Sequence, residues 1–213
     1  MTSIVDFDLQ STDRLLSTTR AVRKRLDLSR PVERSVVSEC IQLATQAPSG
    51  GNSQPWRWLV VDDPTVKAGL ADLYRAAYAP YIEVQRQHAT DAVLESSDFL
   101  AQHLHEVPML VIPCLLTRLD ERPAPADTAG FYGSILPAVW SFQLALRSRG
   151  LGSTFTTLHL WNEADAAHLL GIPETVTQVA LLPVAYTIGT EFKPAPRRDA
   201  EDVTYWNAWR AKA

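Results

Sequence analysis

The sequence predicts a single α+β domain in which helices cover both faces of a sheet. The chain has 213 residues, a length that suits one domain or one domain with arms. Hydrophobic residues make up 46% of the chain and charged residues 21%, so the chain can bury a large core and remain in solution. Helical and strand-like patterns are mixed, and some strand-like runs are almost entirely apolar, which is typical of strands buried on both faces.

Charge, targeting signals and cysteines exclude several classes of protein. A formal net charge of -4 argues against a surface for duplex nucleic acid, which needs a basic stripe. Residues 1–10 hold no basic segment followed by an apolar run, and the longest apolar stretch, 109–116, is too short to span a bilayer. Cys40 and Cys114 lie in apolar surroundings and are expected to be small core residues. We therefore expect a cytoplasmic protein without nucleic-acid or membrane partners.

The N-terminal part of the chain is predicted to form two helices. The first spans residues 13–26, with Ser11 or Thr12 as its N-cap, and the second spans residues 32–47, after Pro31. Apolar residues recur in the second helix at helical spacing and define its buried stripe: Val36, Cys40, Leu43, Ala44 and Ala47.

A polar loop, a strand and a long helical region follow. Helix formers stop at residues 48–55, and residues 58–61 are predicted to be a short buried strand. Residues 65–106 are predicted to be helical and to be broken by Pro80. Because the apolar stripe of this region is thin, we expect it to form a surface lid. Residues 108–116 are predicted to be a second buried strand.

The next elements are a loop over residues 117–128, which we expect to be mobile, and a strong helix over residues 130–149 that ends at Gly150. One apolar face of this helix comprises Ile135, Val139, Phe142 and Leu146. A neighbouring apolar face comprises Leu136, Trp140 and Leu144. So wide an apolar arc predicts a central helix that packs against the sheet or against a second subunit.

Three further segments complete the chain. Residues 151–158 are rich in β-formers, and residues 162–170 are predicted to be a short helix capped by Asn162. Residues 176–188 are predicted to be a buried strand, and residues 189–213 form a tail.

A basic cluster at the end of the predicted first helix is one candidate site. It comprises Arg20, Arg23, Lys24 and Arg25. Several such donors can converge on a phosphate, because the Arg fork and the Lys ammonium group both bind this dianion. The alternative is a solvated helix face, which a charge run alone favours. In the tail, Arg197 and Arg198 are either a cationic strap over a phosphate or part of an exposed arm.

The loop at residues 48–56 is a second candidate site. It crowds polar side chains between a helix and a strand: Ser49, Asn52, Ser53 and Gln54. Two glycines allow close backbone approach to a ligand, and amide side chains can both donate to and accept from a heteroaromatic edge. The alternative is an ordinary connecting loop.

The segment at residues 150–157 is a third candidate, in which small residues let backbone N–H groups face a ligand. It is not a dinucleotide fingerprint, because Phe155 stands where the third glycine is needed, and a plain buried strand is the alternative. The sequence predicts no metal site, phosphate-binding P-loop or nucleophilic serine elbow.

Four blocks, in their order along the chain, resemble the FMN-dependent nitroreductase family. The first is the Arg-rich stretch 19–26, and the second is A-P-S-G-G-N-S-Q-P-W at residues 47–56. The third is R-G-L-G-S with the threonines that follow, at residues 149–157. The fourth is a strand that ends in G-x-x-x-x-P-x-P-R-R at residues 189–198. The second block is the most specific, and the four together cover most of the chain.

The resemblance implies a nitroreductase-like fold with a central mixed sheet flanked by helices. It also implies a homodimer formed through long helices, with the C-terminal arm, residues 189–213, wrapping the partner. Two identical FMN sites would lie at the dimer interface. The expected helical lid at residues 65–106 and the wide apolar arc of residues 130–149 fit this arrangement.

The resemblance also implies roles for matching positions. Arg20 and either Arg23 or Lys24 would bind the FMN phosphate and the N1/O2 edge of the ring, and Arg197 or Arg198 would complete the phosphate site. Ala21 or Val22 stands where the family has a hydroxyl residue, so only a backbone N–H could contribute there. The ring and ribityl chain would lie beside residues of the second block: Pro48, Ser49, Asn52, Gln54 and Trp56. Backbone near Thr156 and Thr157 would approach flavin N5.

The implied chemistry is carried by FMN, with NAD(P)H as the reductant and a ping-pong sequence. Acceptors would be planar and electron-poor, such as nitroaromatics, quinones or free flavins. Tyr74, Tyr78 or Tyr81 either stacks on the acceptor or takes part in ordinary packing. The alternatives are a reductive dehalogenase or a flavin-cleaving enzyme on the same fold, a non-enzymatic flavin-binding protein, and a plain interaction module.

Overall fold

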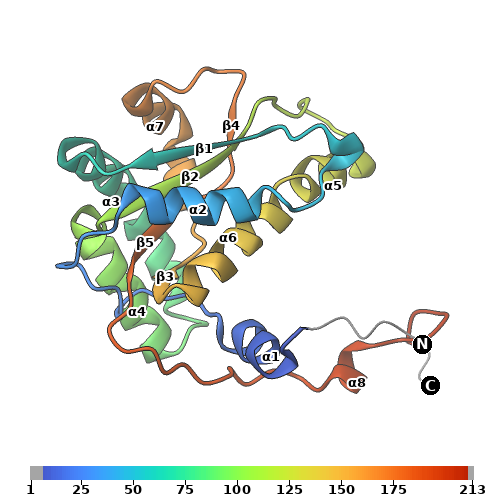
Figure 1. The fold of residues 1–213 in the computed structure, drawn as a ribbon. Coiled ribbons are helices and arrows are strands. Elements are labelled where there is room, and N and C mark those ends of the chain that lie inside the picture. The colour runs from blue at the N-terminus through green and yellow to red at the C-terminus, as the bar shows by residue number, and fades with distance from the viewer. Residues whose placement is uncertain (1–6, 211–213) are drawn as a thin grey trace. The chain divides into compact units, whose positions relative to one another are not determined.

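The computed structural model describes residues 7–210, which form two compact units. The larger unit, Thr19–Thr190, contains the sheet and most of the helices (Figure 1). The smaller unit combines Met1–Thr18 with Glu191–Ala213 and contains α1 (Leu9–Thr18) and α8 (Ala200–Val203). Within the smaller unit, an ion pair of 3.3 Å between Arg14 and Glu191 joins the two segments.

The sheet has the strand order β1-β2-β5-β3, with β4 paired to β2. Its strands are β1 (Trp56–Val61), β2 (Met109–Leu115), β3 (Leu151–Ser153), β4 (Thr177–Gln178) and β5 (Leu182–Tyr186). The pairs between these strands are antiparallel, and parallel pairing enters through a bridge between Ala21 and Ser153. The structure thus confirms an α+β fold with a sheet flanked by helices.

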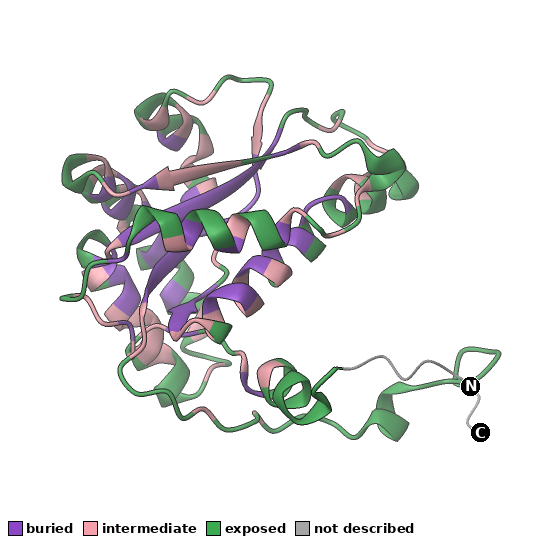
Figure 2. Ribbon diagram, viewed as in Figure 1, coloured by how far each residue is buried: buried purple, intermediate pink, exposed green. Residues whose placement is uncertain are grey.

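The central strand β2 is buried along its whole length (Figure 2). Met109, Val111 and Leu115 belong to a core cluster shared with α2 and α6, whereas Leu110 and Ile112 are buried outside that cluster. Successive side chains of a strand point to opposite faces, so this division places apolar layers on both sides of the sheet. The near-continuous apolar run therefore forms a doubly covered strand, as predicted.

Helices α2 (Arg34–Ala44) and α6 (Leu136–Ser148) pack together on one face of the sheet (Figure 1). Cys40 and Ala44 are buried in α2 as predicted, and Cys114 is buried in β2. Leu43, however, is 49% exposed, because the buried side of α2 is formed by Val37, Cys40 and Ala44. The predicted stripe of this helix is therefore wrong at one residue.

The helix predicted over residues 130–149 is two helices. α5 (Pro125–Gly133) ends before Ser134, and α6 begins at Leu136 with a proline in its first turn. The predicted inner face is confirmed, with these residues at most 1% exposed: Ile135, Val139, Phe142 and Leu146. The neighbouring face stays open, since Leu136 and Trp140 are 40% and 45% exposed.

The expected break at Pro80 is wrong, because α3 (Pro64–Gln85) runs through it and α4 (Asp91–His103) begins only after residues 86–90. Pro80 is exposed, so the helix carbonyl that loses its N–H partner can be hydrated. The expected thin stripe is also wrong: α3 buries Leu70, Ala71, Tyr74, Ala77, Tyr78 and Ile82. Alanine and tyrosine, rather than leucine, isoleucine or valine, supply most of this buried face.

The helix predicted over residues 13–26 is wrong beyond Thr18, where α1 ends. Farther on, the Val22 N–H donates to the Ser153 carbonyl at 2.9 Å, and this bond to the sheet replaces the helical one. The predicted N-caps Ser11 and Thr12 lie inside α1. Asp8 acts as the cap instead, since its side chain accepts from the Ser11 N–H at 3.2 Å.

The remaining differences are shorter elements. The strand predicted over residues 176–188 is divided into β4 and β5, and β3 passes through residues 154–157 into a 3-10 helix, η3 (Leu158–Asn162). Two further 3-10 turns are η1 (Gly50–Asn52) and η2 (Leu104–Glu106). The predicted short helix is confirmed as α7 (Glu163–Leu170), which ends at Gly171 in the left-handed region. The predicted cap is wrong, because the Asn162 side chain makes no capping hydrogen bond and donates to the Leu73 carbonyl instead. Within residues 7–210, no helix combines the length and apolar character that a membrane span requires.

Candidate functional site

The basic residues after Thr19 lie along the margin of the sheet. Val22 is hydrogen-bonded to Ser153, and the Asp27 N–H donates to the Tyr186 carbonyl at 2.8 Å. The Ile188 N–H donates to the Arg25 carbonyl, also at 2.8 Å. Residues 20–27 and 151–157, here called the basic edge, therefore form one hydrogen-bonded assembly. It unites the first and third sequence blocks with the start of the fourth.

Gly152 makes this assembly possible. A Cβ atom at position 152 would lie 2.7 Å from Cγ2 of Thr187 and 3.0 Å from Cβ of Val22. Both contacts are closer than carbon atoms in proteins normally approach. The small residue in β3 thus lets residues 20–27 pack against the strand, which explains one of the glycines of the third block.

A tyrosine from α3 contacts the basic edge. The Tyr74 hydroxyl lies 3.2 Å from the Thr156 hydroxyl, and Tyr74 is 3% exposed. Burial raises the pKa of Tyr74, while the Thr156 hydroxyl and the nearby Arg23 guanidinium act in the other direction. Tyr74 and Thr156 are therefore brought together, and the charge of Arg23 acts on Tyr74, although no sequence block contains Tyr74.

The cations of the basic edge differ in their surroundings. Arg20 and Lys24 are exposed, whereas Arg23 is half-buried. Lys24 Nζ lies 2.9 Å from the Glu95 carboxylate of α4. Arg25 has a structural role, since its Nε donates to the Ile188 carbonyl at 2.9 Å. Arg23 is therefore the half-buried cation of this set whose charge acts on Tyr74, the partner of Thr156.

Polar atoms without partners are buried in and next to the basic edge. Ser153 Oγ, Thr154 Oγ1 and both ring nitrogens of His159 have no hydrogen-bond partner among the described residues. His159 is fully buried in η3, and burial lowers its pKa to about 4. The imidazole is therefore neutral at physiological pH. With the cations, these groups form a donor-rich margin that fits a phosphate and a heteroaromatic edge.

The loop at residues 48–56, here called the amide loop, is shaped by its own side chains. The Gln54 N–H donates to Ser49 Oγ at 3.1 Å, and Gln54 Nε2 donates to Asn52 Oδ1 at 3.2 Å. Three residues have positive φ angles: Gly51 (57°), Asn52 (53°) and Gln54 (49°). Pro48, Asn52 and Gln54 are exposed, so the loop presents amide groups outward on a tightly turned backbone.

Within one chain the amide loop and the basic edge lie at opposite ends of α6. The Gly50 N–H donates at 3.0 Å to Ser134 Oγ, just before α6, whereas β3 begins just after α6. A helix of 13 residues is about 20 Å long. The structure therefore does not bring the two halves of the expected site together in one copy.

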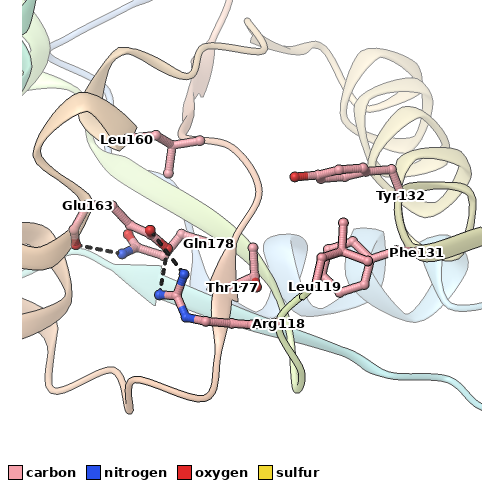
Figure 3. A pocket seen from close by; sticks show the side chains of 8 residues that line it. All are labelled: Arg118, Leu119, Phe131, Tyr132, Leu160, Glu163, Thr177 and Gln178. Carbon is pink, nitrogen blue, oxygen red and sulfur yellow. Dashed lines mark hydrogen bonds and ion pairs between the residues drawn. The ribbon is translucent and has the colours of Figure 1, made fainter. Parts of the chain in front are cut away.

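A cavity of about 250 Å³ lies outside the amide loop and the basic edge (Figure 3). Phe131 and Tyr132 of α5 form one side of it, and Arg118 lies on the other. The Arg118 guanidinium donates to both oxygens of the Glu163 carboxylate, at 2.9 and 3.2 Å. Because this cation is already bound in a bidentate pair, we assign it to the fold and not to ligand binding.

The second arginine pair belongs to the smaller unit. Arg197 and Arg198 are exposed there, and Arg197 Nη1 donates to the Pro196 carbonyl at 2.9 Å. Their expected role at a phosphate stays a prediction.

The larger unit, with its sheet and flanking helices, has an α+β fold of the nitroreductase type. A solved structure of oxidized iodotyrosine deiodinase bound to FMN and 3-iodo-L-tyrosine matches with a TM-score of 0.72 and 24% identity, covering 92% of this chain and 99% of that one. The FMN-dependent nitroreductase NfnB from Mycobacterium smegmatis, in complex with NADPH, matches with a TM-score of 0.70 and 18% identity, covering 94% and 99%.

The chain belongs to the Nitroreductase family, whose model matches residues 16–186. Iodotyrosine deiodinase of Drosophila melanogaster is 29% identical over 71% of this chain and 54% of its own length. Iodotyrosine deiodinase of Thermotoga neapolitana is 28% identical over 78% of this chain and 83% of its own length. The match thus spans about half of the first relative and most of the second.

Proposed function

We propose that this chain binds FMN and, as a homodimer, transfers electrons from NAD(P)H to electron-poor aromatic acceptors. The observation that carries this proposal is the basic edge, where Arg20 and Arg23 flank a small-residue strand beside Thr156 and Tyr74. Membership of the Nitroreductase family supports it independently. A cytoplasmic location, where both nicotinamide cofactors are available, belongs to the same proposal.

The basic edge would hold the phosphate and one side of the ring. Arg20 would bind the phosphate, and the half-buried Arg23 would face the N1/O2 edge, since Lys24 is paired with Glu95. The Val22 N–H is already bonded to Ser153, so a backbone contact from this position would come from Ala21. A fixed cation in a partly dry site stabilises the negative charge that reduction leaves at this edge.

The threonines after β3 would contact the centre of the ring. The Thr156 N–H donates to the Leu181 carbonyl at 3.2 Å, and its hydroxyl lies against Tyr74. Thr157 is exposed, so its N–H is the better candidate for flavin N5. A donor at that atom helps it accept hydride.

The second half of each site would come from the partner subunit. The amide loop and the basic edge of one chain lie at opposite ends of α6, a helix about 20 Å long. On the face that α2 and α6 share, Leu43, Leu136 and Trp140 are apolar yet between 40% and 49% exposed. Pairing two copies through this face would cover it and bring Ser49 and Asn52 to the other chain. Arg197 or Arg198 of the arm would complete the phosphate site.

When bound, FMN supplies a two-electron carrier between reductant and acceptor. For a nitro acceptor, NAD(P)H and one proton convert the nitro group to a nitroso group, and NAD(P)⁺ and water are released. Water can supply the proton, so the residues of the site need only bind, orient and shield the reactants.

Reductive dehalogenation is the second candidate, because two relatives are named iodotyrosine deiodinases. In that reaction, NAD(P)H supplies hydride to the ring carbon that bears iodine, and NAD(P)⁺ and iodide leave. The two candidates share the flavin site and differ in the acceptor.

The test begins with the purified protein reconstituted with FMN under anaerobic conditions. We expect flavin absorption bands that bleach with NADH or NADPH and return on addition of a nitroaromatic. Return with 3-iodotyrosine and release of iodide, without return on nitroaromatics, would favour dehalogenation instead. A chain that takes up no FMN would overturn the proposed function.

A further inference from the structure

An apolar cavity of about 560 Å³ lies between α3 and η3. Its walls are formed mainly by Ala76, Ala77, Pro80, Tyr81, Val84 and Trp161. This volume falls within the roughly 300–1,000 Å³ that small-molecule sites occupy, and such sites are lined mainly by apolar and aromatic side chains. We call this space the apolar cavity.

None of the side chains that line the apolar cavity carries a charge. Beyond the apolar members, the lining residues are Gln85 and Asn162. Asn162 Nδ2 already donates to the Leu73 carbonyl at 2.9 Å. Gln85 is therefore the polar group best placed to give a ligand one hydrogen bond, through an amide that can donate or accept.

Three large apolar side chains in the walls of the cavity are more exposed than is usual for such side chains. Trp161 is 81% exposed, Val84 59% and Tyr81 40%. Burial of apolar surface stabilises by about 25 cal/mol per Å², so a flat apolar molecule that covers these side chains gains affinity from them.

The cavity is connected, through η3 and through α3, to the part of the basic edge that the proposed function assigns to flavin N5. η3 begins directly after Thr157, and Trp161 lies within it. On α3, the rings of Tyr74 and Tyr78 are 6.4 Å apart, as are those of Tyr78 and Tyr81. Tyr74 touches Thr156, and Tyr81 is close enough to Tyr74 to influence its titration. This row of tyrosines runs from the basic edge to the cavity wall.

We infer that the apolar cavity is the acceptor site and that it selects uncharged aromatic acceptors over anionic and zwitterionic ones. This inference rests on the proposed function and names its substrate class. A charged group that enters the cavity loses hydration and meets no opposite charge on the lining side chains, which is costly. An amino acid such as iodotyrosine, with an ammonium and a carboxylate, is therefore a poor acceptor for this chain.

Tyr81 and Trp161 provide the aromatic surface that binds the ring of the acceptor. Val84 keeps the wall of the cavity uncharged, so a charge introduced at this position should change the preference between neutral and anionic acceptors. Tyr74 and Tyr78 do not contact the acceptor: Tyr74 is buried against Thr156, and the Tyr78 hydroxyl donates to Asp98 at 2.7 Å. Of the three tyrosines in α3, only Tyr81 both lines the cavity and is exposed.

The test places a lysine at a position that lines the cavity and, in a separate control variant, at a position that does not. Val84 and Val93 are both exposed valines, at 59% and 50%, but only Val84 lines the cavity. We would prepare Val84→Lys, Val93→Lys and Trp161→Ala as FMN-loaded proteins. Calorimetry on the oxidised proteins gives Kd for para-nitrobenzyl alcohol, which is neutral, and for para-nitrobenzoate, which is anionic. Dimer content is measured in parallel.

We expect the unmodified protein to bind the alcohol at least about tenfold more tightly than the benzoate. Val84→Lys weakens binding of the alcohol and reverses the preference, whereas Val93→Lys changes neither. Trp161→Ala weakens binding of both ligands about tenfold. Equal binding of the two ligands, an unaltered preference in Val84→Lys, or a loss of dimer in place of a change in binding would overturn the inference.

A separate readout tests the proposed function alone. Bleaching of the flavin bands by NAD(P)H needs no acceptor, so it is measured in the unmodified protein and in Val93→Lys, whose substitution lies outside the cavity, and it should be the same in both. If bleaching occurs but the ligand preference is absent, the inference fails and the proposed function stands. If FMN does not bind, the proposed function fails, and the two ligands can still be compared on the flavin-free protein.

Discussion

The basic edge and the amide loop are held in place by different means. In the basic edge, backbone hydrogen bonds to Ser153 and Tyr186 and close packing at Gly152 fix residues that are distant in sequence. The amide loop is exposed and is held by hydrogen bonds among its own residues and by one bond to Ser134. Tertiary structure therefore shapes the first region, and local chemistry shapes the second. Substitutions should damage folding in the first and mainly binding in the second.

Gly152→Val should have the largest effect. A Cβ at this position would lie 2.7 Å from Thr187 and 3.0 Å from Val22, so the edge must move apart. We expect a loss of about 3 kcal/mol or more in the free energy of unfolding, measured by urea denaturation. The control is Gly133→Ala, where an added Cβ meets nothing within 4 Å. That substitution should change stability by at most about 1 kcal/mol, in the stabilising direction. Equal losses in both variants would refute the packing argument.

His159 should make the stability of the region after the basic edge depend on pH. Burial lowers its pKa from 6.5 to about 4, so the folded chain binds this proton less readily than the unfolded chain. The stability that the neutral His159 contributes is fully present above pH 6.5 and is lost as the pH falls toward 4. The loss is on the order of 3 kcal/mol. Urea denaturation at several pH values should show a weaker decline for His159→Leu, and parallel curves would exclude His159 as its source.

Ser134→Ala should have a smaller effect, confined to the amide loop. It removes the acceptor of the Gly50 N–H and leaves the rest of the loop unchanged. We expect a loss of about 1 kcal/mol in stability and FMN binding weakened by about threefold, because the loop is less preorganised. Ser148→Ala is the control, since Ser148 Oγ donates to the carbonyl of Ala145 and accepts from Arg149 Nη1, both at the other end of α6. An FMN affinity that falls equally in the control would count against a role for the amide loop.

Lys24→Gln should have the smallest effect on stability. Its ion pair with Glu95 is 51% and 66% exposed, and such pairs contribute about 0.5 kcal/mol or less. Titration with FMN should show weaker binding for Arg23→Gln than for Lys24→Gln, because Arg23 is half-buried and acts on Tyr74, whereas Lys24 is exposed and paired with Glu95. The opposite order would identify Lys24 as the cation at the ring.

The sequence predicts best where local pattern and tertiary packing agree. Residues 109–115 form a strand because a continuous apolar run suits a strand covered on both faces, and Gly171 ends α7 because it accepts a positive φ. The tight turns of the amide loop agree with its glycines and amides. These features depend on neighbours in sequence, so a single chain reveals them.

Prediction from the sequence fails where contacts between residues far apart in the chain determine the local structure. Residues 19–26 contain good helix formers, but the hydrogen bond from Val22 to Ser153 draws them to the sheet. Tyr74 carries no local signal of its position beside Thr156, since that contact spans 82 residues. The order of the four sequence blocks likewise gives no sign that α6 separates the second from the first and third.

This separation has a consequence for mixtures of damaged chains. If each flavin site combines the basic edge of one copy with the amide loop of the other, a chain carrying Arg20→Ala and a chain carrying Asn52→Ala are each inactive as pure dimers. When the two are unfolded and refolded together, each mixed dimer contains one site with both lesions and one with neither. Two defective proteins should then rescue each other, which two lesions in a site built from a single copy could never do.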